Sequence, residues 1–203
     1  TRANKDDLDK LLDIEQESGV PIRIDTYMMP ATREREMPYN MQSRLSPEEA
    51  ARARIHALKR EMGPELFAQY AQQSIMKADH PAPAQEVPGH MACMAGQCSF
   101  TVNWQGEMRP CVILSGPAVS VFDVGFEAAW KYIVEETGRI LLNAKCSVCH
   151  LRHLCRTCAA SALLETGSYD GVPDYMCRYA EESLEILRKE WESLQNGKDI
   201  SDR

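Results

Sequence analysis

The first 92 residues of this 203-residue chain contain no cysteine, and all eight cysteines fall between Cys93 and Cys177. The chain also lacks an uninterrupted run of about eighteen apolar residues, which a membrane-spanning helix needs. Basic residues are in deficit, with 23 Lys and Arg against 30 Asp and Glu, so the clustered positive charge that nucleic-acid binding requires is missing. A hydrophobic share of 44% excludes wholesale disorder. We therefore expect a cytoplasmic globular protein that binds neither nucleic acid nor a membrane.

The spacing of the cysteines argues against disulfides. Cys146-x2-Cys149 and Cys155-x2-Cys158 are closely spaced pairs. This spacing is typical of cysteines that bind one metal together, and not of disulfides that join distant strands. The N-terminal segment that begins at Thr1 has no apolar secretory core, and a chain of this length can bury a core without covalent cross-links. The cysteines are therefore predicted to bind metal as thiolates.

The residue pattern of the cysteine-free half predicts two helical regions with one strand between them. The expected elements are a helix over 4–18 ended by Gly19, a strand over 21–29, a charged loop over 30–38, and a helix from Ser46 to about Lys77 interrupted at Gly63. Ser46 and Glu49 have the spacing of a capping box, and Ile22, Ile24 and Thr26 alternate with polar residues as in a strand. The proline-rich stretch 80–89 marks a boundary. We expect units over 1–80 and 93–197, joined by a linker over 81–92 and followed by a tail over 198–203.

The residue pattern of the cysteine-bearing half predicts a β-hairpin followed by helices. Phe100, Val102 and Trp104 alternate up to a turn at Gly106, and 108–114 returns as the second arm. Pro110 predicts that this returning arm lies at a sheet edge. The helices are expected over about 124–142, over 159–165, and along a final apolar stripe from 180 to 194 that Gly197 ends. The fold class expected for the whole chain is α+β.

Eight thiolates suffice for two sites of four sulfurs each. Their order is Cys93-x4-Cys98-x12-Cys111, a gap, Cys146-x2-Cys149-x5-Cys155-x2-Cys158, a second gap, and Cys177. Zinc and iron–sulfur clusters are both held by four cysteines, so the ligand type alone does not separate them. Zinc ribbons usually place a dozen or more residues between their two Cys-x2-Cys pairs, and here five intervene. The spacing therefore favours iron–sulfur clusters over zinc.

This pattern resembles the SPASM domain, a C-terminal extension of many radical S-adenosylmethionine (SAM) enzymes that modify peptides and proteins. The family pattern is Cys-x9-15-Gly-x4-Cys, a gap, Cys-x2-Cys-x5-Cys-x3-Cys, a gap and a last Cys. Twelve residues separate Cys93 from Gly106, and four separate Gly106 from Cys111, both within that pattern. The interval Cys155-x2-Cys158 is one residue shorter than usual. The resemblance covers about 93–180.

The resemblance implies two auxiliary [4Fe–4S] clusters with interleaved ligands. The implied ligands are Cys93, Cys98, Cys111 and Cys158 for the first cluster, and Cys146, Cys149, Cys155 and Cys177 for the second. Cys98 is the extra ligand found where the first cluster is fully protein-bound, which favours electron transfer or structural support over direct substrate coordination. Gly106 is implied as the turn that brings Cys111 back toward Cys93.

The first 80 residues resemble the last αβα stretch of the partial (β/α)6 barrel of radical SAM enzymes. The Cys-x3-Cys-x2-Cys loop that binds the SAM-cleaving cluster is absent from the chain. Either the chain is a stand-alone relative without radical chemistry, or, as we expect, SAM and a third [4Fe–4S] cluster belong to a missing upstream domain. In both cases this chain is not expected to cleave SAM alone. The implied partners are a peptide or protein substrate and an electron donor such as ferredoxin or flavodoxin.

Three simpler interpretations of these residues are also possible. The whole chain can be a zinc-binding interaction module without catalysis. His150 and His153 lie inside the cysteine loop, but eight thiolates already fill two sites, so surface or supporting positions are expected for both. The basic residues can form a solvated face balanced by glutamates rather than a substrate contact; they are Arg33, Arg35, Arg44, Arg52, Arg54, Lys59 and Arg60.

Overall fold

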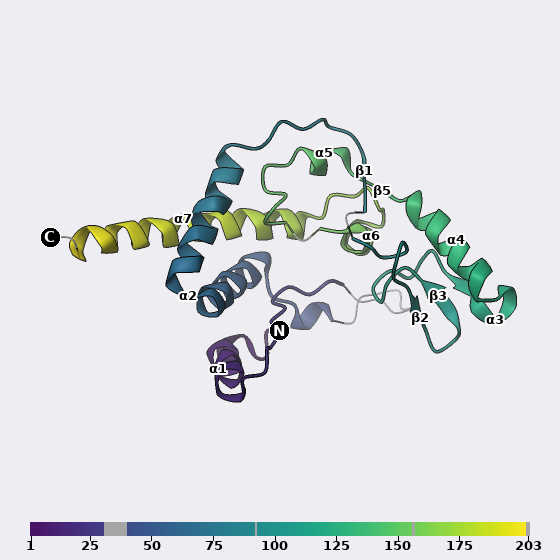
Figure 1. Cartoon of the computed structure of the whole chain (residues 1–203), viewed down its shortest axis with the longest axis horizontal. Helices are drawn as coiled ribbons and strands as arrows, with labels where there is room; N and C mark the ends of the chain where they lie inside the picture. The colour runs from purple at the N-terminus through teal and green to yellow at the C-terminus, as the bar shows by residue number, and fades with distance from the viewer. Residues whose placement is uncertain (31–39, 92, 156, 202–203) are drawn as a thin grey trace.

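The computed structural model of the chain describes the backbone of residues 1–30, 40–91, 93–155 and 157–201, and the side chains of that part up to Asn196. It combines helices with short antiparallel strands. Figure 1 shows α7 (Asp174–Ser201) along the long axis, with the C-terminus at one end and a small sheet at the other. None of the helices in the described part is long and apolar enough to cross a membrane.

The first predicted helix is confirmed. A 3-10 turn, η1 (Lys5–Asp7), leads into α1 (Leu8–Ser18), and Leu12 is buried beneath it. Gly19 ends α1 in the left-handed conformation, with φ of 67°, and its N–H donates to the carbonyl of Glu15 at 3.0 Å. A residue with a Cβ is strained at such a φ, so glycine suits this helix end.

The strand predicted over 21–29 is not formed. This stretch is extended, and Ile22, Ile24 and Thr26 are more buried than Arg23 and Asp25, so the predicted alternation is present. No strand in the described part lies beside it to complete a hydrogen-bonded ladder. Alternation specifies which side chains are buried, but a strand also needs a neighbour. The charged loop expected over 30–38 lies outside the described residues except for Pro30.

The interrupted second helix is confirmed as α2 (Pro47–Asp79), which follows a short 3-10 turn, η2 (Met41–Ser43). The capping box forms as predicted: the Glu49 N–H donates to Ser46 Oγ at 3.1 Å, and the Ser46 N–H donates to Glu49 Oε2 at 3.0 Å. The helix kinks at Gly63, where φ is 72° and ψ is 171°. The predicted interruption therefore bends one long helical element.

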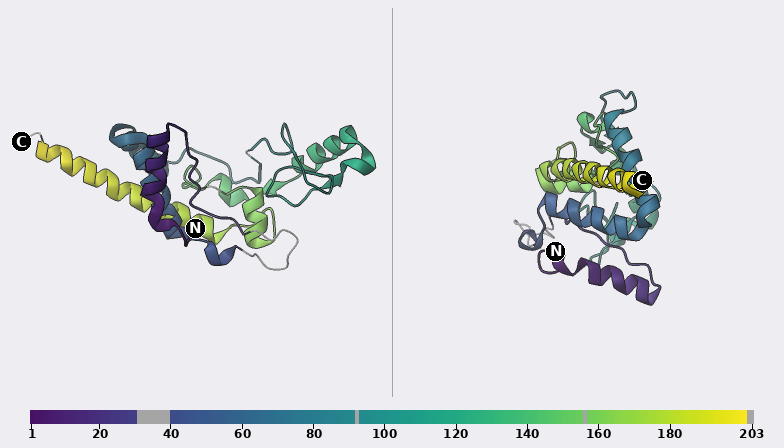
Figure 2. Two further views of the ribbon diagram at one scale, coloured as in Figure 1. Left: turned by 90° about the horizontal axis from the view of Figure 1, so that it is seen from below. Right: turned by 90° about the vertical axis from the view of Figure 1, so that its left-hand side faces the viewer.

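The main core joins the two halves of the sequence. α2 lies between α1 and α7, as the right-hand view of Figure 2 shows. The apolar side chains buried between these helices and the cysteine loop are Ile55, Leu58, Phe67, Ala71, Ala78, Leu151, Leu154, Ala180, Leu184 and Leu187. The division into units over 1–80 and 93–197 stays a prediction, but these two regions share one hydrophobic core.

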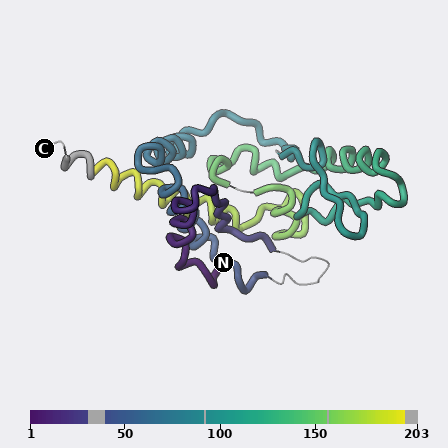
Figure 3. The backbone as a smooth tube through the Cα atoms, turned by 60° about the horizontal axis from the view of Figure 1, so that its bottom comes forward, coloured from purple at the N-terminus to yellow at the C-terminus, as the bar shows by residue number. Residues whose placement is uncertain are grey.

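The proline-rich stretch forms a long connection from α2, which is visible at the top of Figure 3. It has no helix or strand until β1 (Gly89–His90), which pairs antiparallel with β5 (Leu141–Leu142). The linker predicted over 81–92 therefore ends in a sheet contact instead of remaining free along its whole length.

The predicted hairpin is confirmed, although its strands are short. β2 (Thr101–Val102) pairs with β3 (Glu107–Arg109), and β3 also pairs with β4 (Val119–Ser120). β3 is thus the central strand, so the edge position predicted from Pro110 is wrong. Pro110 lies one residue beyond β3, where its missing N–H interrupts no ladder.

Gly106 occupies the turn between β2 and β3, as predicted. Its φ is 82°, and its N–H donates to the carbonyl of Asn103 at 3.0 Å. A Cβ at this position would lie 2.2 Å from the ring of Phe122. Both the backbone conformation and the close approach of Phe122 require glycine here.

The three remaining predicted helices are present with shifted ends, and the structure adds the short helix α5 (Ala144–Ser147), which was not predicted. In chain order, the helices of this region are α3 (Val121–Val124), α4 (Phe126–Gly138), α5, α6 (Ala159–Thr166) and α7. The helix expected over 124–142 is broken at Gly125 and ends before Ile140, because residues 141–142 form β5 instead. Gly197 does not end the last helix, which continues to Ser201.

Candidate metal centres

One cavity of about 130 Å³ collects the four cysteines assigned to the second cluster. Cys146 comes from α5, Cys149 and Cys155 from the loop that follows it, and Cys177 from the first turns of α7. These residues are up to 31 positions apart in sequence. The structure therefore brings together the set that the resemblance implied.

The cysteine loop is held by its own leucines. Leu151 and Leu154 are buried in the core between α2 and α7. The N–H of Cys155 donates to the carbonyl of Leu151 at 2.9 Å, which closes a helical turn between the second and third cysteines. Asn143 caps α5, its side chain accepting from the Lys145 N–H at 3.0 Å. Packing of apolar neighbours thus determines where the thiols of this loop lie.

The thiols in this cavity lie close enough to influence one another electrostatically. Burial, followed by the neighbouring sulfurs of Cys155, Cys146 and Cys149, raises the pKa of Cys177 to about 11. Burial also raises the pKa of Cys146, while the guanidinium of Arg152 opposes that rise. Several thiolates in one partly buried cavity repel one another, so a metal cation would favour their deprotonated forms.

Backbone N–H groups point at cysteine sulfurs of both assigned sets. The N–H of Thr157 donates to Cys155 Sγ at 3.4 Å, and Thr157 Oγ1 lies 3.0 Å from the same sulfur. The N–H of Leu114 donates to Cys111 Sγ at 3.4 Å. Hydrogen bonds to ligating sulfurs adjust the reduction potential of iron–sulfur clusters. Sequence reasoning did not identify Thr157, Leu114 or Arg152, although Thr157 and Arg152 lie within the predicted loop.

The cysteines assigned to the first cluster surround a second core. Cys111 and Cys158 pack against buried side chains that include Met91, Leu142 and Ala160. Cys93 and Cys98 are exposed and flank a tight turn, whose Ala95 packs against the same core. Cys111, Cys158 and the turn that carries Cys93 and Cys98 thus share one environment.

The sulfurs do not have the arrangement of a single-ion site. In the described ranges, no three side chains of His, Cys, Asp or Glu gather closely enough to hold one metal ion. A tetrahedral zinc site with Zn–S bonds of about 2.3 Å needs its sulfurs within about 4 Å of one another. The described thiols therefore do not form a preformed tetrahedral site.

The two histidines of the cysteine loop have different positions. His150 lines the cavity with the four cysteines. His153 instead forms a 2.9 Å hydrogen bond with the carbonyl of Ser74 in α2, and burial lowers its pKa. His153 thus connects the loop to α2, which is the supporting position expected from the sequence.

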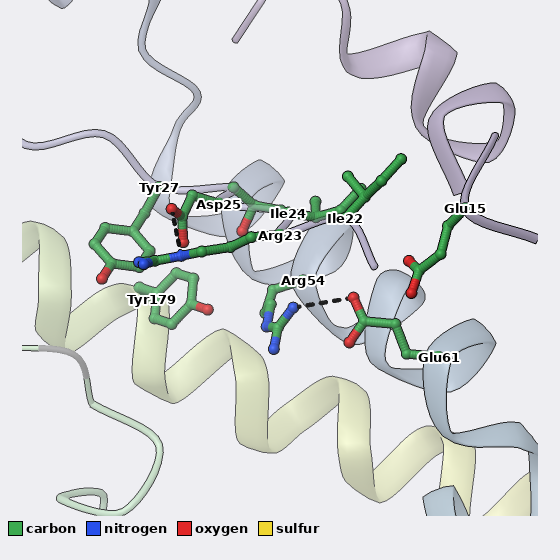
Figure 4. A pocket seen from close by; sticks show the side chains of 10 residues that line it. Glu15, Ile22, Arg23, Ile24, Asp25, Tyr27, Arg54, Glu61 and Tyr179 are labelled. Carbon is green, nitrogen blue, oxygen red and sulfur yellow. Dashed lines mark hydrogen bonds and ion pairs between the residues drawn. The ribbon is translucent and has the colours of Figure 1, made fainter. Parts of the chain in front are cut away.

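A second, larger cavity of about 450 Å³ lies among α1, the extended segment 22–27, α2 and α7 (Figure 4). Charged pairs lie at its wall: Arg54 to Glu61 at 3.4 Å and Arg23 to Asp25 at 2.9 Å. No cysteine or histidine lines it. Its paired charges and open surroundings give no indication of a catalytic group.

The basic residues of the first half form ion pairs, mostly with carboxylates of other helices. The pairs include Arg44–Glu165, Arg52–Glu182, Lys59–Glu190 and Arg60 with both Asp9 and Asp13. The charges are therefore paired as expected, but the solvated face is wrong for Arg44, which is buried, because these partners come from α1, α6 and α7 rather than from nearby glutamates. Arg33 and Arg35 lie outside the described residues.

Comparison with known proteins yields no relative. No protein-family model, no curated protein and no solved structure matches this chain. The SPASM resemblance therefore stays a prediction from the cysteine spacing.

Proposed function

We propose that this chain is the auxiliary-cluster part of a radical SAM enzyme that modifies a peptide or protein. The observation that carries the proposal is the cavity shared by Cys146, Cys149, Cys155 and Cys177, because the resemblance in cysteine spacing implies the same set. Four thiolates are a ligand set of [4Fe–4S] clusters, so the donors fit the group. By the same resemblance, Cys93, Cys98, Cys111 and Cys158 would hold the first cluster.

The residues of the chain have defined tasks in this proposal. Bound clusters would supply one-electron transfer. The N–H groups of Thr157 and Leu114 would stabilise the negative charge on two ligating sulfurs. Arg152 places a positive charge beside the cavity, and Leu151 and Leu154 keep water from one side of the loop. These contacts favour thiolates and modulate the electron affinity of the site.

The partners belong to the same proposal. A missing upstream domain with SAM and a third [4Fe–4S] cluster would generate the radical, and a ferredoxin or flavodoxin would exchange electrons with this part. The excess of acidic residues supports a role that does not involve nucleic acid. The expected location is the cytoplasm, where thiols stay reduced.

Metal analysis after anaerobic purification tests the proposal directly. We expect about eight irons and about eight sulfides per chain, with broad visible absorbance that dithionite bleaches. A colourless protein with two zinc ions per chain would show instead that the chain is the zinc-binding interaction module.

Matched cysteine variants test the assignment of ligands. Cys177→Ala and Cys158→Ala should each remove about four irons, from different clusters, as electron paramagnetic resonance of the reduced proteins can distinguish. Val148→Ala and Met94→Ala change partly exposed neighbours of the cysteines and should leave the iron content unchanged. Loss of the same signal in both cysteine variants would reject the interleaved assignment.

A further inference from the structure

The lobe formed by β2, β3, β4, α3 and α4 lies at the end of the molecule opposite the C-terminus (Figure 1). Exposed large apolar side chains concentrate on this lobe. We define the aromatic face as Phe100, Val102, Trp104, Phe122 and Phe126. Trp104 is 90% exposed and Phe122 is 80% exposed. Isolated exposed apolar residues are ordinary, but a concentration of large ones marks a binding surface.

The members of the aromatic face are connected to one another. The ring of Phe100 lies 5.4 Å from that of Phe126, edge to face, and 5.5 Å from that of Trp130. Phe122 covers Gly106, in the same turn that carries Trp104. Val102 lies opposite Met108, which is buried against α4. The face therefore extends from α4 across β2 to the tip of the hairpin.

Beside the aromatic face, the outer edge of β2 has no neighbouring strand in the described part. β2 is an edge strand, and its only partner in the described part is β3. The N–H of Asn103 donates to the carbonyl of Glu107 at 3.0 Å, across the hairpin. Inward and outward hydrogen bonding alternate along an antiparallel strand, so the N–H and C=O of Val102 point away from β3. These groups can pair with a further extended chain.

The charge around the aromatic face is negative. Asp123 and Glu127 are exposed and make no ion pair within the described ranges. Residues 100–138 carry five acidic and two basic side chains. A second copy of this chain docked through the same face would bring like charges together, which is unfavourable, whereas a basic partner would be attracted.

We propose that the aromatic face binds an extended, basic peptide segment whose alternate side chains are apolar. The segment pairs with the outer edge of β2, places its apolar side chains against Phe100, Phe126 and Trp104, and brings its basic residues to Asp123 and Glu127. Strand addition at an open edge is a general mode of peptide recognition, in which backbone pairing gives affinity and alternate side chains give specificity. Resting on the proposed function, this segment belongs to the substrate that the enzyme modifies.

Fluorescence anisotropy with a labelled synthetic peptide tests this inference on the metal-loaded full chain. The probe is a peptide of alternating lysine and valine, compared with a glutamate–valine peptide and with a lysine–valine peptide N-methylated on alternate residues. We expect the first to bind and the other two to bind at least about tenfold more weakly. Equal binding of the N-methylated peptide would overturn pairing with β2, and equal binding of the glutamate peptide would overturn the charge argument.

Exposed-residue variants locate the site without disturbing the core. Trp104→Ala and the double variant Asp123→Lys/Glu127→Lys should each weaken binding about tenfold. Leu66→Ala removes another side chain that is 60% exposed, on α2, and should have no effect. Equal weakening by all three overturns the inference, as does a dimer in sedimentation that Trp104→Ala dissociates, because a second copy would then be the occupant.

The metal and peptide results separate this inference from the proposed function. Full iron content without peptide binding would reject the peptide site alone. Peptide binding by a chain that holds only zinc would reject the enzyme assignment and leave the peptide site in place.

Discussion

Glu49 shows how one residue combines a local and a distant interaction. Its carboxylate accepts from the Ser46 N–H at 3.0 Å, as the capping-box spacing predicted, and it also pairs with Lys5 at 2.6 Å. These contacts lower the pKa of Glu49 to about 2. The hydrogen bond to Lys5 lowers it most, and the hydrogen bond to the Ser46 N–H comes next. A single side chain thus caps α2 and holds the N-terminal turn η1 against it.

This lowered pKa predicts an acid-dependent loss of stability. A carboxylate with a depressed pKa in the folded state contributes stability above its ordinary value of 4.5, and this contribution is lost as the pH falls toward about 2. We expect the free energy of unfolding to fall more steeply over this range for the natural chain than for Glu49→Gln. Urea titrations followed by circular dichroism at several pH values measure this free energy, with Glu65→Gln on α2 as the control. Parallel pH profiles for all three proteins would contradict the linkage.

The kink of α2 is an element-scale feature set by one residue. Gly63 has a φ of 72° and a ψ of 171°, a region of backbone space that is essentially limited to glycine. Leu58, before the kink, and Phe67, after it, contact the same core because the bend keeps both parts of α2 against α7. The bend is therefore a condition of the packing between the two longest helices.

Substitution at the kink should be costly even though no atom blocks a Cβ there. Gly63→Ala is expected to lower the free energy of unfolding by about 1–3 kcal/mol, because alanine is strained in this conformation. Gly138→Ala, within α4, also has free space for the added methyl group and should be neutral or stabilising by up to about 1 kcal/mol. Chemical denaturation of both variants measures their free energies of unfolding. Equal changes in the two variants would show that α2 can straighten without loss of stability.

At the scale of the whole molecule, a buried charge pair joins the cysteine-free half to α6 and α7. Arg44 is 6% exposed and pairs with Glu165 of α6, which is 13% exposed. The guanidinium also lies 3.5 Å over the ring of Tyr175 in α7, whose hydroxyl donates to the carbonyl of Leu45 at 3.2 Å. α6 begins next to Cys158 and α7 carries Cys177, so Arg44 supports two of the helices at the cysteine sites.

Breaking this pair should destabilise the whole chain. Arg44→Met leaves the Glu165 carboxylate buried without its partner, and we expect a loss of about 3–5 kcal/mol in the free energy of unfolding. Arg44→Met combined with Glu165→Met removes both charges and should recover most of that loss. Cooperative unfolding is measured by circular dichroism and tryptophan fluorescence. A double variant as unstable as the single one would show that the stacking on Tyr175, rather than the charge pair, is the essential contact.

The sequence by itself determined the elements whose signals are local. The capping box at Ser46, the break at Gly63, the turn at Gly106 and the short helix after Cys158 are found where they were predicted, because each depends on residues within a few positions of one another. The spacing of the cysteines likewise anticipated that Cys177 would join the loop cysteines at one cavity, although through a resemblance and not through local physics.

The tertiary structure alone decided what depends on neighbours. The alternation over 21–29 produced no strand because nothing in the described part pairs with it, and β3 became central because β4 returns beside it. The partner of Arg44 lies 121 residues away in the sequence, and only folding places Glu165 beside it. Periodicity states which side of a segment is buried, whereas ladders, ion pairs and cavities require two segments to meet, and that meeting is set by the packing of the whole chain.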